Sequence, residues 1–417
     1  MTQSSKLPDL AAVEARDAAD PLRSKRDLFV LPEGVIYLDG NSLGPAPKAA
    51  FAALETAAHQ EWAQGLIRSW NSAGWFTLTD TLGDQIGRLI GSGPGQTVVS
   101  DTTSINIYKA LHAAFSLNPG RSVIVAEGSS FPTDLYMAEG VAATRGAKLR
   151  LEGVDAPGLE ELIDDKVAVV LVNHVDYRSG LMRDMAALTR KTQAAGAVIV
   201  WDLCHSAGAM PVDLDGASVD LAIGCTYKYL NGGPGAPAFI YAAKRHHEKL
   251  MQPLSGWWGH AKPFAFEQGY RPDAGIRRLL CGTQPILSLR ALQASLDLWD
   301  TIDLVALRQK SIGLTDLFIE LVEGMCSEYG VKLASPRDGK TRGSQVSFAH
   351  PEGYTVMQAL IARGVIGDFR APDVIRFGFA PLYIRYRDVY DAATVLRDVL
   401  ATGAWRDPRY ATRSAVT

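Results

Sequence analysis

The fold of this 417-residue chain is decided by the stretch Val198-Ile199-Val200-Trp201-Asp202-Leu203-Cys204-His205. Its four leading apolar residues predict a strand buried on both faces, and the polar residues after them predict a loop at the strand's carboxyl end. Similar apolar runs recur along the chain, at 122–126, 148–151, 167–172, 221–224 and 238–242. Helix-like segments alternate with these runs, at 46–66, 104–115 and 185–195. The alternation predicts an α/β fold with a mostly parallel sheet sandwiched by helices.

The chain is longer than one hydrophobic core usually supports, so we expect one large and one smaller domain. The alternating pattern extends over residues 46–290, which we predict to form the large domain. Residues 291–417 combine helix-like stretches with short strands and predict a smaller α+β domain. The first 45 residues are too few for a domain, and we expect them to pack on the smaller one.

Composition narrows the classes of partner. The net charge is -3 and no basic block occurs, which argues against nucleic acid or an anionic membrane as a partner. No apolar run approaches the length of a membrane span, and the polar N-terminus lacks the apolar core of a signal peptide. Four scattered cysteines show neither CxxC nor zinc-ligand spacing, at Cys204, Cys225, Cys281 and Cys326. We therefore expect a cytoplasmic protein with reduced thiols and no metal site.

The chemistry is indicated by polar residues that directly follow the predicted strands, where ligands of open parallel sheets bind. Asp202 and Lys228 follow two such strands, 26 residues apart (228 − 202). Pyridoxal 5′-phosphate requires a lysine amine for its Schiff base and a carboxylate against its pyridine nitrogen. The stretch Asp101-Thr102-Thr103-Ser104 precedes an apolar helix and offers hydroxyls and helix N-terminal amides to a phosphate. The sequence therefore predicts pyridoxal phosphate bound to Lys228.

Each of these features also has an ordinary interpretation. A lysine after a strand is usually a solvated surface charge, and an aspartate there is more often a helix N-cap. A strand followed by Asp-x-x-His also occurs in metal sites and hydrolases. The order of Asp202 and Lys228 within one α/β pattern favours the cofactor over these separate interpretations.

Five longer motifs make the prediction more specific: Tyr37–Gly44 (YLDGNSLG), Phe131–Asp134 (FPTD), Trp201–Gly208 (WDLCHSAG), Thr226–Gly235 (TYKYLNGGPG) and Gly256–His260 (GWWGH). With them the chain resembles kynureninase over nearly its whole length. The resemblance implies the aspartate aminotransferase-like fold type I, with a seven-stranded-type sheet in the large domain. It also implies hydrolysis of L-kynurenine to anthranilate and L-alanine through aldimine, quinonoid and ketimine intermediates. Whether 3-hydroxy-L-kynurenine is also a substrate stays open.

The resemblance implies roles for individual side chains. Lys228 carries the Schiff base, Asp202 faces the pyridine nitrogen, and Tyr227 either shuttles protons or only binds the phosphate. The cofactor-binding residues implied are Thr103, Ser104, Phe131, Asp134, Asn173, Asp202, His205, Tyr227, Lys228, Trp257 and Thr283. The substrate residues implied are Arg376, Asn41, Ser42 and His260.

Arg376 is expected to pair bidentately with the substrate's α-carboxylate. Trp257 and Thr283 are expected to reach the phosphate from the partner subunit of a homodimer. Two positions depart from the family pattern: Asn173 stands where a Ser or Thr is expected, and Thr283 where some members carry Asn. Both retain a hydrogen-bonding side chain. Trp70 and Trp75 are candidates for the aryl pocket, but the sequence does not rank them against simple packing.

Two rival functions have to be weighed. A cysteine desulfurase or selenocysteine lyase shares the Asp and Lys core but needs a thiol on a mobile loop of the C-terminal third. Cys326, the one late cysteine, lies in an apolar-periodic helix, which predicts a buried, inert thiol. A dinucleotide-binding protein would need G-x-G-x-x-G between a strand and a helix; the nearest stretch, 91–95, carries a proline and no helix follows it at once.

Overall fold

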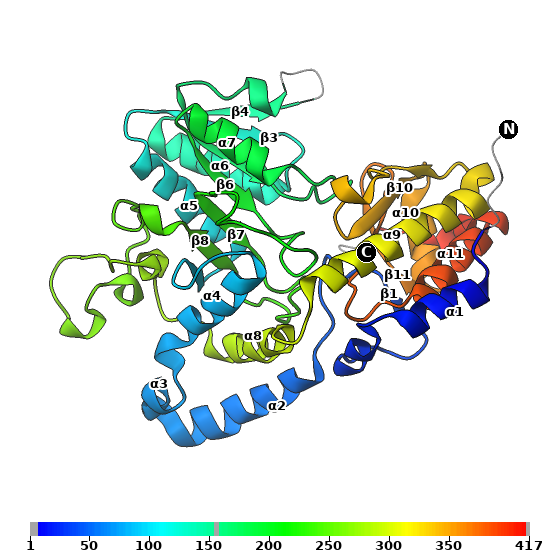
Figure 1. The fold of residues 1–417 in the computed structure, drawn as a ribbon, viewed down its shortest axis with the longest axis horizontal. Helices are drawn as coiled ribbons and strands as arrows, with labels where there is room; N and C mark the ends of the chain where they lie inside the picture. Colours follow the sequence, from blue (N-terminus) through cyan, green and yellow to red (C-terminus); the bar gives the residue numbers. More distant parts are fainter. Residues whose placement is uncertain (1–6, 154–157, 414–417) are drawn as a thin grey trace. The chain divides into compact units, whose positions relative to one another are not determined.

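The structure is a computed structural model that describes residues 7–153 and 158–413. The chain divides into two compact units, shown in Figure 1. The larger unit comprises Ala49–Asp176 and Arg183–Thr301, and the smaller unit comprises the chain up to Lys48, Tyr177–Met182 and Ile302 onward. Residues Tyr177–Met182 belong to the smaller unit, although the chain before and after them belongs to the larger unit. The sequence pattern did not predict this.

A seven-stranded sheet forms the centre of the larger unit, in the order β2-β8-β7-β6-β5-β3-β4. β8 is antiparallel to both of its neighbours, and the other adjacent pairs are parallel. The strands are β2 (Thr97–Val99), β3 (Val123–Glu127), β4 (Lys148–Glu152), β5 (Val167–Asn173), β6 (Val198–Asp202), β7 (Leu221–Gly224) and β8 (Phe239–Ala242). Every strand residue except those of β4 is buried, which explains why continuous apolar runs mark them. The predicted mostly parallel sheet is confirmed.

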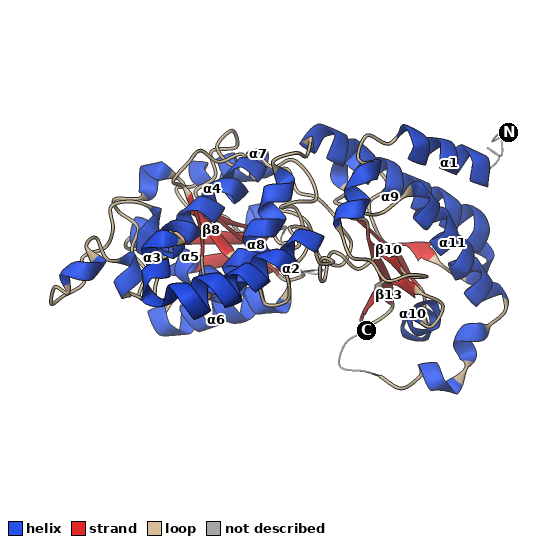
Figure 2. Ribbon diagram, turned by 90° about the horizontal axis from the view of Figure 1, so that it is seen from below, coloured by secondary structure: helices blue, strands red, loops and turns tan. Residues whose placement is uncertain are grey.

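Helices cover both faces of this sheet. Figure 2 shows α4 and α7 on one side and α5 and α6 on the other. The helices are α2 (Lys48–Thr56), α3 (Ser69–Ser72), α4 (Leu78–Leu89), α5 (Thr103–Leu117), α6 (Pro132–Arg145), α7 (Met185–Ala194) and α8 (Ile286–Trp299). α2 continues as a π-helical stretch over Ala57–Gly65. Most of α5 is buried, because it packs across β5, β6, β7 and β8.

The smaller unit contains an antiparallel sheet in the order β12-β13-β10-β9 and a separate parallel pair of β1 with β11. Its strands are β1 (Ile36–Tyr37), β9 (Lys332–Leu333), β10 (Gln345–Ala349), β11 (Val365–Ile366), β12 (Asp368–Arg370) and β13 (Val374–Gly378). Its helices are α1 (Leu10–Ala19), α9 (Leu304–Cys326), α10 (Gly353–Ile361) and α11 (Tyr386–Ala401). This is the α+β architecture expected for the C-terminal part.

The N-terminal helix α1 is fixed to the smaller unit by charged side chains. Asp17 accepts hydrogen bonds from the backbone N–H groups of Tyr386 (2.7 Å) and Arg387 (2.9 Å), at the start of α11. A carboxylate at this end of a helix is stabilised by the unpaired amides and the helix dipole. Asp20 forms an ion pair of 2.7 Å with Lys310 of α9, and both side chains are buried.

Two further observations bear on partners. Among the residues that the structure describes, no helix has the length and apolar character needed to cross a membrane. Within the same residues, no group of three or more His, Cys, Asp and Glu side chains is arranged to hold a metal ion.

Candidate active site

Lys228 lies at the carboxyl edge of the seven-stranded sheet. It follows β7, and its Nζ lies 3.0 Å from Nε2 of His205, which follows β6. β6 and β7 are parallel neighbours, with Asp202 in register with Ile223, so the segments after them emerge at one edge. Asp202 ends β6 and is buried, and its Oδ1 accepts the N–H of Cys204 at 2.6 Å. The structure therefore places an amine, an imidazole and a buried carboxylate at one edge of the sheet.

Asp134 and Asn173 complete this group. Asp134 is 1% exposed and accepts a hydrogen bond of 3.1 Å from Nδ2 of Asn173, which also bonds Ser130 Oγ at 3.0 Å. Burial, and then the nearby Asp202 carboxylate, raise the pKa of Asp134 well above its usual value. The amide of Asn173 makes both bonds, so this departure from the expected Ser or Thr retains a polar anchor beside Asp134.

Two aromatic rings flank the amine of Lys228. Its Nζ lies 5.9 Å from the ring centre of Phe131 and 6.0 Å from that of Tyr227. Phe131 remains 42% exposed, so part of this side chain is open to a ligand. The Cys225 sulfur, and then burial, raise the pKa of Tyr227. A phenol that holds its proton suits hydrogen-bond donation to a phosphate better than proton shuttling at neutral pH.

The proposed phosphate cradle opens α5, where Thr103 and Ser104 are the first helical residues. The Oγ1 of the N-cap residue Thr102 accepts the N–H of Ile105 at 3.4 Å, which is the usual way such a helix begins. Thr103 Oγ1 lies 4.0 Å from Cys204 Sγ, so the start of α5 is adjacent to the loop after β6. Hydroxyls and helix N-terminal amides thus lie near the Asp202 edge, in keeping with the sequence.

Sequence reasoning missed Lys109, which is fully buried in α5. Its ammonium forms an ion pair with Asp101 and donates to Ser100 Oγ (3.3 Å) and to the backbone oxygen of Leu279 (2.6 Å). Asp101 has a positive φ of 49°, and its N–H bonds Gln284 Oε1 at 3.3 Å. Lys109 therefore fixes the turn that leads into the cradle. A lone cation inside an apolar helix was the signal available in the sequence.

The smaller unit brings two of the predicted substrate residues, Asn41 and Ser42, to the region of Arg376, whereas His260 belongs to the larger unit. This buried arginine on β13 is the register partner of Asp368 on β12. Its Nε donates to Asp368 Oδ1 at 2.8 Å, and its Nη2 donates to Asp368 Oδ2 and to Ser42 Oγ, the latter at 3.0 Å. Its Nη1 donates to the backbone oxygen of Tyr177. The structure thus brings Ser42 to Arg376, with a carboxylate on one edge of the guanidinium that the sequence did not indicate.

Asn41 lies in the same region and is fully buried. A Cβ at position 378 would come within 2.0 Å of Asn41 Oδ1, so a glycine is required there to admit the amide. Asp39 is a further member of this region that the sequence analysis did not name as a site residue. Burial, and then the Asp368 carboxylate, raise the pKa of Asp39 to about 7. Arg370 donates to Asp368 Oδ2 at 2.7 Å and adds a second guanidinium to the group.

Comparison with known proteins decides the family. A family model described as "Kynureninase C-terminal domain" matches residues 307–396. A curated protein named Kynureninase from Burkholderia pseudomallei (strain K96243) is 54% identical over 408 residues, which cover 97% of this chain and 98% of that protein. Kynureninase from Pseudomonas fluorescens is 52% identical over 416 residues, or 98% of this chain and 99% of that protein. The chain belongs to the kynureninase family.

Solved structures confirm the fold without extending the function. A C-DES mutant with glycine covalently linked to its PLP cofactor has a TM-score of 0.75 at 16% identity, covering 89% of this chain and 98% of that one. The apo cysteine desulfurase of Thermococcus onnurineus NA1 has a TM-score of 0.74 at 20% identity, covering 96% and 100%. These likenesses confirm the fold type predicted for this member of the kynureninase family.

The late cysteine considered for the desulfurase alternative is not exposed. Cys326 is fully buried at the end of α9, and burial raises the pKa of its thiol to about 12. A thiol in that setting is a poor nucleophile. The dinucleotide alternative fails locally, because the glycine-rich stretch 91–95 leads into strand β2 instead of a helix. Both observations agree with membership of the kynureninase family.

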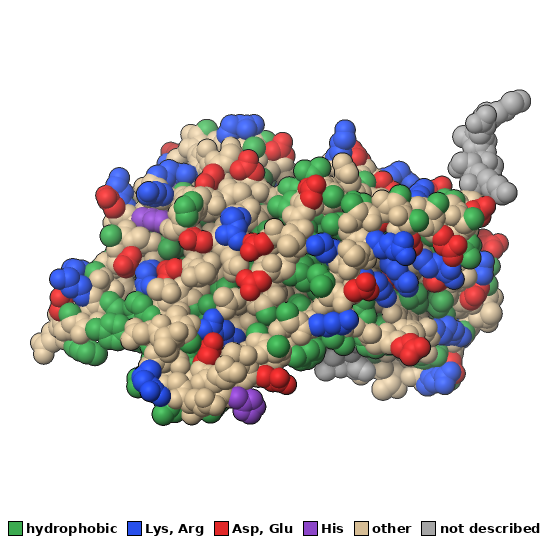
Figure 3. Space-filling model, turned by 60° about the horizontal axis from the view of Figure 1, so that its bottom comes forward, with side chains coloured by type: hydrophobic (Ala, Val, Ile, Leu, Met, Phe, Trp, Pro, Cys, Tyr) green, Lys and Arg blue, Asp and Glu red, His purple; other side chains and the backbone are tan. Residues whose placement is uncertain are grey.

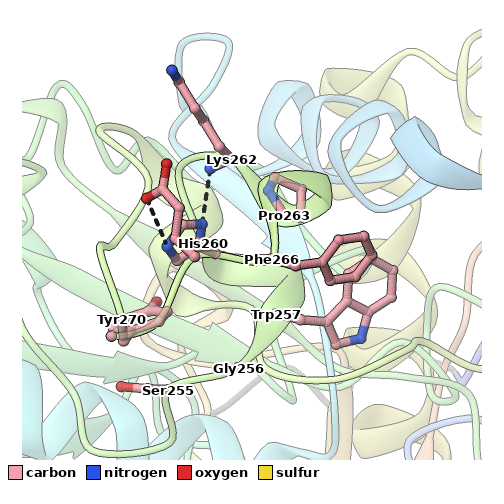
Figure 4. A pocket seen from close by; sticks show the side chains of 10 residues that line it. Ser255, Gly256, Trp257, His260, Lys262, Pro263, Phe266 and Tyr270 are labelled. Carbon is pink, nitrogen blue, oxygen red and sulfur yellow. Dashed lines mark hydrogen bonds and ion pairs between the residues drawn. The ribbon is translucent and has the colours of Figure 1, made fainter.

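Gly256, Trp257 and His260 of the family motif line a pocket of about 410 Å³, shown in Figure 4. His260 Nδ1 accepts the N–H of Lys262 at 3.0 Å, and its Nε2 lies 3.9 Å from Glu267. Lys228 is not among the residues that line this pocket. Thr283 is exposed, in the segment that follows the Leu279 contact of Lys109. Trp257 and His260 thus share a pocket that Lys228 does not line, and Thr283 lies two residues after Cys281, whose backbone oxygen accepts the N–H of Trp258 at 3.2 Å.

The two tryptophans that the sequence left unranked differ in position. The ring centre of Trp70 lies 6.4 Å from that of Trp257 and 5.1 Å from that of Trp258. Trp70 therefore packs behind Trp257, which lines this pocket. Trp75 is 9% exposed, and its Nε1 donates to Glu61 at 2.7 Å. We therefore assign Trp75 to packing and favour Trp70 as the aromatic neighbour of the pocket.

Proposed function

We propose that this member of the kynureninase family binds pyridoxal phosphate through Lys228 and hydrolyses L-kynurenine to anthranilate and L-alanine. The observation that carries the proposal is the grouping of Lys228, His205 and Asp202 at one sheet edge, in a chain that shares more than half of its residues with curated kynureninases. Use of 3-hydroxy-L-kynurenine, which would give 3-hydroxyanthranilate, depends on the shape of the aryl pocket.

The donor set fits the cofactor. Lys228 offers an amine, Asp202 a buried carboxylate for the pyridine nitrogen, and Phe131 a partly exposed aromatic side chain. Thr103 and Ser104 at the start of α5 offer hydroxyls and amides to the phosphate. When bound, pyridoxal phosphate supplies an electron sink for the carbanion that forms at the substrate's α-carbon.

The chain's own groups then have defined tasks. The Lys228 amine, which lies 3.0 Å from His205, is the base for the substrate's α-proton and returns a proton later. Tyr227 keeps its phenolic proton and donates to the phosphate. Arg376 takes the substrate's α-carboxylate, with Asn41 and Ser42 beside it. Water adds to the aryl ketone, and collapse of the hydrate breaks the bond between the β and γ carbons.

A homodimer with shared sites is part of this proposal. Trp257, Phe264 and Phe266 are exposed by 38%, 63% and 84%, and Trp62 and Ile67 by 60% and 75%. Figure 3 shows hydrophobic side chains gathered at the left end of the larger unit. An apolar surface of this kind favours a protein partner, and a second copy would allow Trp257 and Thr283 to reach the other subunit's phosphate.

Subunit complementation tests the shared site. Lys228→Ala and Trp257→Ala chains, each of low activity alone, are mixed under conditions that exchange subunits. Hybrid dimers contain one site with both residues intact, so activity should return on mixing. No gain in activity, although native mass spectrometry shows dimers that contain one chain of each variant, would contradict a shared site.

The four cysteines are free thiols, which supports a cytoplasmic location. A role in tryptophan degradation, through the kynurenine pathway, or in a branch toward NAD biosynthesis would follow from the substrate. A small-molecule substrate and a second copy of the chain are the partners we propose; neither nucleic acid nor membrane has a role in the proposal.

The reaction is tested by supplying the purified chain with pyridoxal phosphate and L-kynurenine and following anthranilate fluorescence. Fluorescence should rise with wild type and with the exposed-lysine control Lys249→Ala, and should fail to rise with Lys228→Ala. Release of sulfide from cysteine, without anthranilate from kynurenine, would instead identify a desulfurase and contradict the proposal.

A further inference from the structure

The guanidinium of Arg376 is held from several sides in the protein alone. Asp368 takes the edge formed by Nε and Nη2, and the two outer nitrogens contact Ser42 Oγ and the backbone oxygen of Tyr177. The side chains of Arg376 and Asp368 are each 1% exposed. A planar fork that makes bidentate bonds has little freedom to rotate. These contacts fix the orientation of the guanidinium before a substrate carboxylate arrives.

The same contacts determine the charge of the Asp368 carboxylate. Burial acts to raise the pKa of Asp368, but the Arg376 and Arg370 guanidiniums outweigh it and the pKa is lowered, so this carboxylate stays ionised. Ser42 Oγ donates to Asp368 Oδ2 at 2.9 Å, so one carboxylate orients both the arginine and the serine. A buried guanidinium without a carboxylate would be strongly destabilised. Asp368 thus permits Arg376 to be buried while an outer edge faces Ser42.

We propose that Asp368 is a positioning residue for substrate recognition: it holds the inner edge of Arg376, directly and through the hydroxyl of Ser42, so that the guanidinium meets the substrate's α-carboxylate in a fixed orientation. The proposal rests on the carboxylate-binding role proposed above for Arg376. Asp368 does not itself contact the substrate, so its effect is on binding of ligands that carry a carboxylate.

The test compares L-kynurenine with kynuramine, the amine that lacks the α-carboxylate. In Asp368→Asn the KM for L-kynurenine should rise about tenfold or more, as expected when a charged hydrogen bond is lost, while kcat changes less. The inhibition constant of kynuramine should stay within about twofold, because it makes no use of the carboxylate clamp. Asp368→Glu keeps the charge but adds a methylene, so its KM for L-kynurenine should lie between those of wild type and Asp368→Asn. This variant replaces Asp368→Asn in the test if the Asn variant folds poorly. Asp373→Asn, a matched loss of charge in the turn before β13, is the control.

Two outcomes with the Asp368 variants would overturn the proposal. An unchanged KM in both Asp368 variants means that Arg376 does not need this carboxylate. An equal rise in the KM for L-kynurenine and in the inhibition constant of kynuramine means that Asp368 only supports the fold. Arg376→Met separates the positioning role of Asp368 from the carboxylate-binding role of Arg376. If Arg376→Met raises the KM and Asp368→Asn does not, only the positioning role fails. If Arg376→Met leaves the KM unchanged, the role of Arg376 in the proposed function fails as well.

Discussion

The Lys228 group in the larger unit and the Arg376 group in the smaller unit are built in different ways. The Lys228 group lies at the carboxyl ends of parallel strands, where Asp202 at the end of β6 and Lys228 after β7 lie at one edge of the sheet. The second depends on cross-strand pairing, with Asp368 opposite Arg376 in an antiparallel sheet. The order and direction of parallel strands bring the Lys228 group together. A specific register between two antiparallel strands brings together the Arg376 group, which we call the recognition group. We therefore expect substitutions in the first to lower kcat and those in the second to raise KM.

The largest expected effect comes from Lys228→Ala. Removing the amine eliminates both the attachment of the cofactor and the base for the α-proton, so kcat should fall by at least about a thousandfold. Arg376→Lys is the counterpart in the other group: a point charge cannot make the fork, and KM should rise about tenfold or more with a smaller change in kcat. Steady-state kinetics with L-kynurenine separate the two. A large loss of kcat in Arg376→Lys at unchanged KM would break the comparison.

Lys109→Met tests whether the cradle depends on a residue outside the family motifs. Its ammonium joins Asp101 to Leu279, so its loss leaves a partly buried carboxylate without its cation and loosens the turn before Thr103. The dissociation constant of pyridoxal phosphate should rise about tenfold, measured by titrating the cofactor-free protein. Lys166→Met, an exposed lysine in the same unit, should bind as wild type does. Equal affinities for the two variants would restrict Lys109 to a packing role.

The recognition group should respond to pH through Asp39. Below its raised pKa of about 7 Asp39 is neutral, and the two guanidiniums of Arg370 and Arg376 exceed the single charge of Asp368. Above it Asp39 is ionised and that excess is cancelled, so the substrate carboxylate binds less well. Tyr37 also interacts with Asp39, and burial raises the pKa of Tyr37 beyond this range.

KM for L-kynurenine should therefore increase a few-fold as pH rises through about 7. Asp39→Asn removes the titration, and its KM should vary less with pH than that of wild type. Profiles of the same shape for both proteins would assign the change to a group other than Asp39.

The smallest effect is expected for Cys326→Ala. The thiol is buried and stays protonated, so kcat and KM should remain within about twofold of wild type. A modest loss of thermal stability is expected from the cavity. Loss of turnover in a variant that keeps its melting temperature would revive a thiol mechanism and contradict the account.

The ease with which the two groups could be predicted follows from their construction. Strand β6 is buried throughout, so its apolar run and the Asp202 after it are visible in the sequence. β12 is three residues long and reads Asp-Phe-Arg, with a charge at each end and no run to mark it. Its pairing with β13 places Asp368 against Arg376, and no local pattern encodes that register. Arg376 itself was predicted through family resemblance.

Lys109 illustrates a second limit. Its helix was predicted from periodicity, but Leu279, one of its partners, is 170 residues away in the sequence. The raised pKa of Tyr227 depends first on Cys225, two residues away in the sequence, then on burial and on Cys204, which is 23 residues away (227 − 204). Sequence patterns thus located elements and the residues at their ends, while contacts distant along the chain and the charges they shift required the folded structure.

The central claim is that Lys228 is the residue that holds the cofactor. The most direct measurement is to load the protein with pyridoxal phosphate, reduce it with borohydride, and find the labelled peptide by mass spectrometry. The account predicts a single label on Lys228, with none in Lys228→Ala. A label on Lys109 or another lysine, or no label on loaded wild-type protein, would contradict it.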